Sequence, residues 1–304
     1  MNIKILLFNS FNLSSLTSLS LFNVQEEIGG DSFGKFERCT DNGDNGKPVY
    51  VKSYRIEDVG LGVPISLICQ ISLLKQMDHP RITRLQEVLI SITASRVYQV
   101  FEYAGPNLKD FLKNSQETAG NRQLTKSFMH QILTGIYYYH SNNFVHGFLT
   151  PYQLLIDIKN NRLKVAHVGM AVTPSFKAPE IMLGFKNYSF PADVWSIGCI
   201  FAEMVLLKPL FGSADEFHER GRIFSFMGTP NEETMPGVTA AYEYLHCFTK
   251  HEPKDLSPIF RDHLEPAGFD LLMRMLRMNP RKRITVDEAL RHEYFQNVYI
   301  PNQK

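Results

Sequence analysis

"DVWSIGCIFAEMVLL", residues 193–207, is the stretch that decides the fold of this 304-residue chain. It is apolar almost throughout, and Asp193 and Glu203 are its only charged residues. A helix that is apolar on all sides is buried in the core of a large protein. The stretch therefore predicts a buried helix with a large, mainly helical body around it.

The part of the chain after residue 105 has helical periodicity. One stretch of about 20 residues carries apolar side chains on one side of a helix, as an amphipathic helix does. Two shorter stretches nearer the C-terminus have the same spacing. Besides residues 193–207, the predicted helices cover 124–143, 268–278 and 285–295.

The part before residue 105 is rich in strand-forming residues. Residues 48–56 and 95–103 are rich in Val, Tyr and Ile, which indicates two strands. The turn signal "DNGDNGKP" (41–48) precedes the first of them. Between the strands, "PISLICQISLLKQM" (64–77) has helical spacing and starts with a proline, which suits the first turn of a helix.

These patterns predict an α+β fold with two lobes. A small β-rich lobe with one main helix covers 21–104, and a larger, mainly helical lobe covers 105–297. A short hinge joins them near residue 104. Residues 1–20 have one Lys, no acid and only a short apolar run, so we expect an N-terminal extension without regular structure rather than a signal peptide. Residues 298–304 form a tail.

The composition is that of an ordinary globular protein. Hydrophobic residues make up 44%, charged residues 21%, and the net charge is +1, so nothing draws the chain to nucleic acid or an anionic membrane. No stretch reaches the about 20 apolar residues of a membrane span. The four cysteines are far apart and form no CxxC pair, which predicts no zinc site or disulfide framework and indicates a reducing, intracellular compartment.

Several segments, in order, resemble the eukaryotic protein kinases, and within them the cyclin-dependent kinases of the CMGC group. Several motifs in the right order are far more specific than a single glycine-rich loop. The resemblance covers about residues 22–297 and implies a bilobal fold that binds ATP between its lobes. The segments are "GVPISLICQISLLKQMDHPRI" (62–82), "KAPEIMLG" (177–184), "ADVWSIGCIFAEM" (192–204), "KPLF" (208–211), "FMGTPNEE" (226–233) and "NPRKRITVDEALRHEYF" (279–295).

The resemblance places the catalytic loop at "HGFLTPYQ" (146–153), but without its chemistry. Phe148 stands where the family has the Asp that orients the substrate, Thr150 replaces the loop Lys, and Gln153 replaces the metal-binding Asn. A phenyl ring can neither accept a proton nor bind a metal. The metal-binding Asp of the family is His167 here. Because Mg²⁺ requires oxygen ligands, we interpret His167 as a cleft histidine without metal.

The nucleotide-binding positions are kept only in part. The glycine-rich loop "GGDSFG" retains Gly29 and Gly34, but Asp31 replaces the second glycine and would repel phosphate. Lys52 stands at the position of the strand lysine, although a lysine on a strand often simply faces solvent. Its helix partner is Gln70 instead of Glu, so the ion pair becomes a hydrogen bond at best. The remaining nucleotide-binding positions, in the hinge, are Glu102 and Ala104.

The resemblance also implies an altered adenine pocket. Tyr50 stands where the family has a small Ala, and Phe36 stands where it has Val. Leu155 aligns to the residue below the purine. We infer that Phe36, Tyr50 and Leu155 form an apolar column that replaces the adenine with side chains.

The activation segment, residues 167–180, has only 14 residues, far fewer than in the family. Thr173 does not align convincingly to the phosphorylated Thr. Two arginines that hold the phosphate in the family are Cys69 and Gly147 here. The phosphate and its binding site are therefore missing together, which is coherent because an Arg cluster without its phosphate is unsatisfied charge.

The residues that hold the fold are kept. The resemblance implies an ion pair between Glu180 and Arg283, and it makes Asp193 the residue that anchors the catalytic-loop backbone. The apolar spine of the family aligns to His146, Leu74, Leu85 and Val168. Folding constraints thus remain where catalytic ones do not.

The leading hypothesis is a pseudokinase that resembles cyclin-dependent kinases and acts as a regulatory or scaffolding binding protein in cell-cycle control, without a cofactor. One alternative is an active serine/threonine kinase that uses ATP and Mg²⁺, which would need a substitute carboxylate such as Asp157. The other is the non-functional product of a duplicated kinase gene. The resemblance implies residence in the nucleus or cytoplasm.

The expected partner is a protein, a cyclin or a related kinase, rather than nucleic acid or a membrane. In the family, the helix at 64–77 docks a cyclin. Cys69 and Gln70 replace the Arg and Glu of the family on this helix, so cyclin binding is a hypothesis. The helix could also simply pack on its own lobe. The candidate residues are Pro64, Ile68, Cys69, Gln70 and Ile71.

Overall fold

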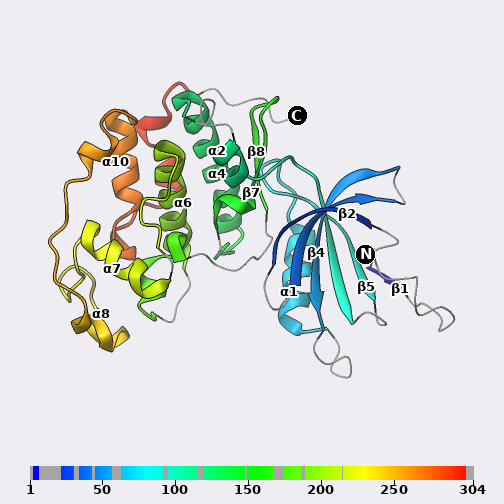
Figure 1. Ribbon diagram of the computed structural model, residues 1–304, viewed down its shortest axis with the longest axis horizontal. Coiled ribbons are helices and arrows are strands. Elements are labelled where there is room, and N and C mark those ends of the chain that lie inside the picture. The colour runs from blue at the N-terminus through cyan, green and yellow to red at the C-terminus, as the bar shows by residue number, and fades with distance from the viewer. Residues whose placement is uncertain are drawn as a thin grey trace. The chain divides into compact units, whose positions relative to one another are not determined.

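The structure is a computed structural model that describes residues 3–6, 22–30, 34–42, 45–56, 63–91, 95–114, 120–147, 149–166, 174–185, 189–213 and 215–298. The chain divides into two compact units. The N-terminal unit comprises 1–105 and 166–171, and the C-terminal unit comprises 106–165 and 172–304. The first is a sheet with one helix and the second is mainly helical, which confirms the predicted α+β fold (Figure 1).

One mixed sheet forms the N-terminal unit, with strand order β1-β5-β6-β4-β3-β2. Neighbouring strands of this sheet pair antiparallel, except that β1 runs parallel to β5. The strands are β1 (Ile3–Leu6), β2 (Phe22–Gly30), β3 (Gly34–Asp41), β4 (Lys47–Arg55), β5 (Leu85–Ser91) and β6 (Arg96–Glu102), and the helix is α1 (Ile65–Gln76).

The two stretches rich in Val, Tyr and Ile form β4 and β6, which pair with each other inside the sheet. The predicted turn between β3 and β4 carries Asn45 and Gly46 with φ of 50° and 73°, values that Asn and Gly tolerate best. Buried apolar side chains of the sheet form one core cluster, which consists of Phe22, Cys39, Val49, Val51, Leu89, Tyr98 and Val100.

The N-terminal extension differs from the expectation. Residues 1–20 were predicted to lack regular structure, but Ile3–Leu6 form β1 and pair in parallel with Val88–Ser91 of β5. The physical reason is that an edge strand presents unpaired backbone groups, which another segment can satisfy by adding a strand. The other residues of the extension lie outside the described part of the chain.

The C-terminal unit is built around α6. Its helices are α2 (Leu108–Asn114), α4 (Arg122–Ser141), α5 (Pro179–Met182), α6 (Phe190–Leu206), α7 (Glu216–Met227), α8 (Val238–Ala241), α9 (Ser257–Phe260), α10 (Pro266–Met275) and α11 (Val286–Leu290). Short 3₁₀ turns lie at η3 (Pro151–Gln153), η4 (Pro174–Phe176), η5 (Glu243–Cys247), η6 (Pro280–Lys282) and η7 (Glu293–Phe295), and the strands β7 (Leu154–Asp157) and β8 (Arg162–Val165) pair antiparallel.

Helix α6 is the buried helix that the sequence predicted. Every residue from Ala192 to Met204 is buried, because α4 and α10 pack against it (Figure 1). The helix predicted over 285–295 is in fact two short pieces, α11 and η7. The first piece ends at Leu290, and His292, whose backbone is extended, caps the second piece. The ring of His292 accepts a hydrogen bond from the Tyr294 amide at 3.2 Å. Within the described residues, no helix is both long and apolar enough to cross a membrane.

Candidate functional site

Two aromatic rings stack on each other in the N-terminal unit. Phe36 comes from β3 and Tyr50 from β4, and their ring centroids lie 5.0 Å apart at an interplanar angle of 27°. Both side chains are almost completely buried, with exposed fractions of 1% and 2%. Their positions in the sheet follow from the register, which pairs Phe36 with Lys52 and places Tyr50 two residues earlier on the same strand.

Tyr50 is also fixed at its other end. Its hydroxyl donates a hydrogen bond of 2.6 Å to the carbonyl oxygen of Gly105, and its ring centroid lies 5.1 Å from that of Tyr103. Aromatic pairs at this separation stabilise each other by about 0.5–1.5 kcal/mol beyond their burial. Phe36, Tyr50 and Tyr103 thus form an aromatic row, which ties β3 and β4 to the segment after β6.

The strand lysine is buried rather than facing solvent. Lys52 is 4% exposed, and its ammonium lies 4.4 Å from the centroid of the Tyr54 ring. The Tyr54 hydroxyl donates a hydrogen bond of 3.1 Å to the Gln70 amide oxygen on α1. A tyrosine therefore connects the lysine to the helix residue, by a cation–π contact on one side and a neutral hydrogen bond on the other.

The two glycines of the glycine-rich loop pair within the sheet. Gly29 lies opposite Phe36 and Gly34 lies opposite Tyr54. A Cβ atom on Gly34 would lie inside the contact radius of the Ser53 carbonyl oxygen, so only glycine fits there. This requirement comes from strand packing and holds whether or not a nucleotide binds.

The two hinge positions also belong to the N-terminal unit. The carboxylate of Glu102 accepts a hydrogen bond of 2.9 Å from the backbone amide of Arg84, and the Glu102 amide donates one of 3.1 Å to the Arg84 carbonyl oxygen. Glu102 therefore holds the start of β5 beside the end of β6. Ala104 is half-buried and precedes Gly105, which accepts the bond from Tyr50.

In the C-terminal unit, Asp193 holds the start of the catalytic-loop segment. One carboxylate oxygen accepts from the His146 amide at 2.9 Å and the other from the Gly147 amide at 2.8 Å. The ring of His140, on α4, lies 2.9 Å from the first of these oxygens. Asp193 is 1% exposed, so its charge is compensated by three polar neighbours rather than by water.

Thr150 and Gln153 stabilise the backbone of the loop by a local hydrogen bond and a capping box. The backbone amide of Thr150 donates a hydrogen bond of 2.9 Å to the side-chain oxygen of Gln153, and the two residues form a capping box around η3. Both residues are buried. The amide oxygen at the position that the resemblance assigns to metal binding is thus engaged in a local turn.

Leu155 lies on β7, is 1% exposed and bridges to Asn107. Because it belongs to the C-terminal unit, the proposed column with Phe36 and Tyr50 stays a prediction. Asp157 ends β7, and its two carboxylate oxygens accept from the backbone and the side chain of Asn160 at 3.3 and 2.6 Å. The carboxylate suggested as a catalytic substitute therefore stabilises the turn between β7 and β8.

Glu180 and Arg283 form the ion pair that the resemblance implies. It is bidentate, with nitrogen–oxygen distances of 2.7 and 2.9 Å, and both side chains are almost fully buried. The guanidinium also donates to the carbonyl oxygen of Pro191 at 2.6 Å and lies 5.2 Å from the Trp195 ring. Arg283 therefore links Glu180 of α5 to α6.

Helix α1 presents two faces. Leu67, Ile71 and Leu74 are buried, whereas Ile65 and Ile68 are 79% and 52% exposed. Ile71, one of the predicted partner residues, is therefore turned into its own unit. Pro64 and Cys69 are exposed beside the two isoleucines, whereas Gln70 is half-buried under its hydrogen bond with Tyr54.

Two predicted positions, Phe148 and His167, lie outside the described residues, as do Asp31, Val168 and Thr173. Sequence reasoning missed Tyr54, Tyr103 and His140. Tyr54 could have been found, because it is two residues after Lys52 and so projects from the same face of the strand. The contacts of Tyr103 and His140 join segments far apart in the sequence and leave no local signal.

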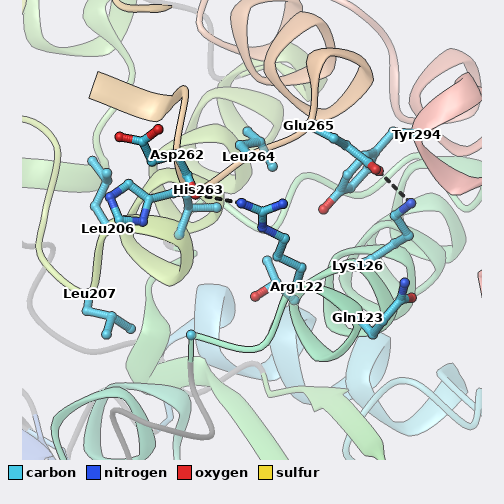
Figure 2. A pocket seen from close by; sticks show the side chains of 13 residues that line it. Arg122, Gln123, Lys126, Leu206, Leu207, Asp262, His263, Leu264, Glu265 and Tyr294 are labelled. Atoms are coloured by element: carbon cyan, nitrogen blue, oxygen red, sulfur yellow. Dashed lines mark hydrogen bonds and ion pairs between the residues drawn. The ribbon is translucent and has the colours of Figure 1, made fainter. Parts of the chain in front are cut away.

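A pocket of about 420 Å³ lies in the C-terminal unit, away from all predicted site residues (Figure 2). Arg122 donates to the carbonyl oxygen of Asp262 at 2.5 Å, and Lys126 pairs with Glu265 at 2.6 Å. Figure 2 shows that both cations contact residues on the other side of the pocket. The pocket thus carries no concentrated charge of one sign.

The described residues contain no group of three or more His, Cys, Asp or Glu side chains placed to hold a metal ion. Cys39 and Cys199 are buried, and Cys69 and Cys247 are exposed. Burial raises the pKa of Cys39 to about 12, so this thiol is inert at neutral pH.

A comparison with protein-family models places these observations in one family. The model described as "Protein kinase domain" matches residues 22–295, which is nearly the whole described chain. The match begins with β2 and ends with η7, so it includes both units. This chain belongs to the protein kinase family.

Proposed function

We propose that this protein kinase domain no longer transfers phosphate and that it acts by binding other proteins. The proposal joins the family membership to the residues that occupy the catalytic positions. Phe148, His167 and Gln153 replace the three residues that orient the substrate and hold the metal in the family. None of the three carries a carboxylate, and phosphoryl transfer depends on positioning and on metal-bound charge.

The observation that carries the proposal is the aromatic row of Phe36, Tyr50 and Tyr103. The resemblance assigns the first two positions to small residues that sandwich the purine. Stacked rings 5.0 Å apart, one of them hydrogen-bonded at 2.6 Å to Gly105, would occupy the space that an adenine needs at the same place. Removing the row would cost the stacking, the hydrogen bond and the burial of two large side chains.

The environment of Lys52 gives further support. In an active kinase the strand lysine pairs with a glutamate and with phosphate. Here the ammonium faces the Tyr54 ring, whose hydroxyl is bonded to Gln70. This arrangement stabilises a buried cation without a helix carboxylate, so the N-terminal unit keeps its packing without the catalytic ion pair.

We further propose that the exposed face of α1, formed by Pro64, Ile65, Ile68 and Cys69, binds the partner. Two large apolar side chains exposed on one helix face are typical of an interaction site. The expected partner is a cyclin or a related kinase, since this helix docks cyclins in the family that the sequence resembles. Such binding would give the chain a regulatory role in the cell cycle.

The first experiment is a series of thermal melts with millimolar ATP, with and without Mg²⁺. A ligand at about 100 times its Kd raises stability by roughly 2.7 kcal/mol, which is several degrees for a domain of this size. We expect no shift for the natural protein. The double variant Phe36→Val/Tyr50→Ala should gain an ATP-dependent shift.

A shift of several degrees in the natural protein, larger with Mg²⁺, would overturn the proposal and call for a phosphotransfer assay. Tyr50→Phe is the matched control, because it keeps the ring and loses only the bond to Gly105. This variant should be slightly less stable and equally insensitive to ATP.

The second experiment measures binding to a panel of purified cyclins. Ile68→Glu should abolish any binding, whereas Ser66→Glu, an exposed position on a different side of the same helix, should weaken it far less. Equal loss in both variants would mean that added charge, and not the isoleucine face, is responsible.

A further inference from the structure

A concave, strongly basic surface lies at the end of α10, far along the chain from α1. It encloses about 780 Å³ between α10, η6 and α11. We define the basic groove by the cations Arg274, Arg277, Arg281, Lys282 and Arg291 and the acids Asp270, Glu288 and Glu293 that line it. The residues from 271 to 286 include five cations and no acid, in a chain with a net charge of only +1.

Three of these cations have no side-chain partner among the described residues. Arg277, Arg281 and Lys282 are exposed, and within the described residues their side chains have no hydrogen bond or ion pair. Arg274, by contrast, pairs with Asp270 at 2.9 Å, and Arg291 pairs with Asp287. The groove thus keeps three positive charges available for a ligand.

Two of the three acids that line the groove, Asp270 and Glu288, already have hydrogen-bond or ion-pair partners. Asp270 lies 2.9 Å from both Arg274 and His292, whose hydrogen bonds lower the pKa of its carboxyl despite desolvation. Glu288 accepts from the backbone and hydroxyl of Thr285, which lowers its pKa too. These two carboxylates therefore stay charged and are bonded to other groups, and neither forms an ion pair with Arg277, Arg281 or Lys282.

The backbone that carries the free cations is held in place. Below the groove, Arg283 donates from Nε to the carbonyl oxygen of Arg277 at 3.0 Å and from Nη2 to that of Met278 at 3.3 Å. The side chain of Asn279 accepts from the Arg281 amide at 3.0 Å. A fixed backbone reduces the conformational entropy that is lost on binding. The backbone that carries these cations is therefore partly preorganised for an anionic ligand.

We propose that the basic groove binds an acidic peptide segment of a partner protein through carboxylate or phosphoryl oxygens. Arginine presents a planar fork that matches either group, and Lys282 adds a compact charge. A concave site with acids among its cations suits a short segment with a few anionic groups. A flat membrane surface or a long nucleic acid would bring negative charge onto Glu288 and Glu293 as well.

The test measures fluorescence anisotropy of labelled peptides with the full chain. The probes are a peptide rich in Asp and Glu, a phosphoserine peptide, and a neutral version with Gln and Asn. We expect saturable binding of one or both anionic peptides, weaker at higher salt, and none of the neutral peptide. The stronger of the two tells whether carboxylate or phosphoryl groups are preferred.

Arg277→Gln/Arg281→Gln/Lys282→Gln should weaken binding by about tenfold or more, as three exposed ion pairs would. The variant should melt like the natural protein, since these side chains have no partners in the described residues. The matched control Lys113→Gln/Lys208→Gln/Lys250→Gln removes the same charge from exposed sites outside the groove.

Three outcomes would overturn the proposal. One is the absence of saturable binding by either anionic peptide. Another is an equal loss in the control variant, which would mean that general charge attraction acts. The third is binding to vesicles containing phosphatidylserine but to no peptide, which would point to a membrane surface.

Discussion

The Tyr50 hydroxyl donates a hydrogen bond of 2.6 Å to the carbonyl oxygen of Gly105, a residue 55 positions further along the chain. The bond joins β4 to the segment after β6, inside one unit. Because the same ring stacks on Phe36, Tyr50 is part of the scaffold of the N-terminal unit. In the function proposed above, the contacts that stabilise the N-terminal unit are also those that occupy the purine site.

The first prediction concerns Tyr50 itself. Tyr50→Phe should lower the free energy of unfolding by about 1 kcal/mol, the typical net contribution of one hydrogen bond. Tyr50→Ala should lower it by about 3–5 kcal/mol, because a large buried ring leaves a cavity. Urea denaturation measures both. Equal stability of the natural protein and the Phe variant would show that the bond to Gly105 contributes nothing.

The second prediction concerns Gly34. Gly34→Ala should destabilise the protein by about 1–3 kcal/mol, because its Cβ would collide with the Ser53 carbonyl oxygen and push β3 from β4. Gly221→Ala in α7 is the control. Its Cβ would meet only the Phe248 ring at 3.8 Å, so it should be neutral or stabilising, as alanine favours helix. A stable Gly34 variant would contradict the close approach of the strands.

The third prediction concerns the buried ion pair. Arg283→Met should cost about 3–5 kcal/mol, since it leaves the Glu180 carboxylate buried without its cation. Adding Glu180→Met should recover much of that loss, because two apolar side chains can replace a buried pair. Arg291→Gln, which breaks an exposed pair with Asp287, should cost less than about 1 kcal/mol. Denaturant melts that rank these variants otherwise would disprove the argument.

The fourth prediction is a pH dependence that arises from Glu219 in α7. Burial raises the pKa of this carboxyl to about 7, against an ordinary value of 4.5, with Arg222 opposing the shift. The folded state therefore retains a proton that the unfolded state releases. The contribution of Glu219 to stability is full below about pH 4.5 and is lost as the pH rises through about 7.

Glu219→Gln should accordingly reduce the change in melting temperature between about pH 5 and pH 8, and it should raise the melting temperature near pH 8. Glu233→Gln, at an exposed position, serves as the control and should leave the profile of the natural protein unchanged. Identical profiles for the natural protein and the Glu219 variant would mean that this carboxyl titrates normally.

The sequence by itself determined the α+β fold and the central buried helix. It did so because hydrophobic periodicity is a local property of the sequence, and residues 192–204 are predominantly apolar all around α6. The kept ion pair of Glu180 and Arg283 could also be inferred from sequence, since both residues stand in recognisable motifs. The prediction that the catalytic positions are substituted also came from the sequence alone.

Only the tertiary structure decided how the altered residues are used. The bond of Tyr50 to Gly105, the placement of Tyr54 between Lys52 and Gln70, and the turn held by Gln153 depend on which backbone groups meet in space. The same is true of β1, whose pairing with β5 satisfies an open sheet edge that no local pattern reveals. Hydrogen bonds and ring contacts act over a few ångströms, so their partners are set by folding rather than by distance along the chain.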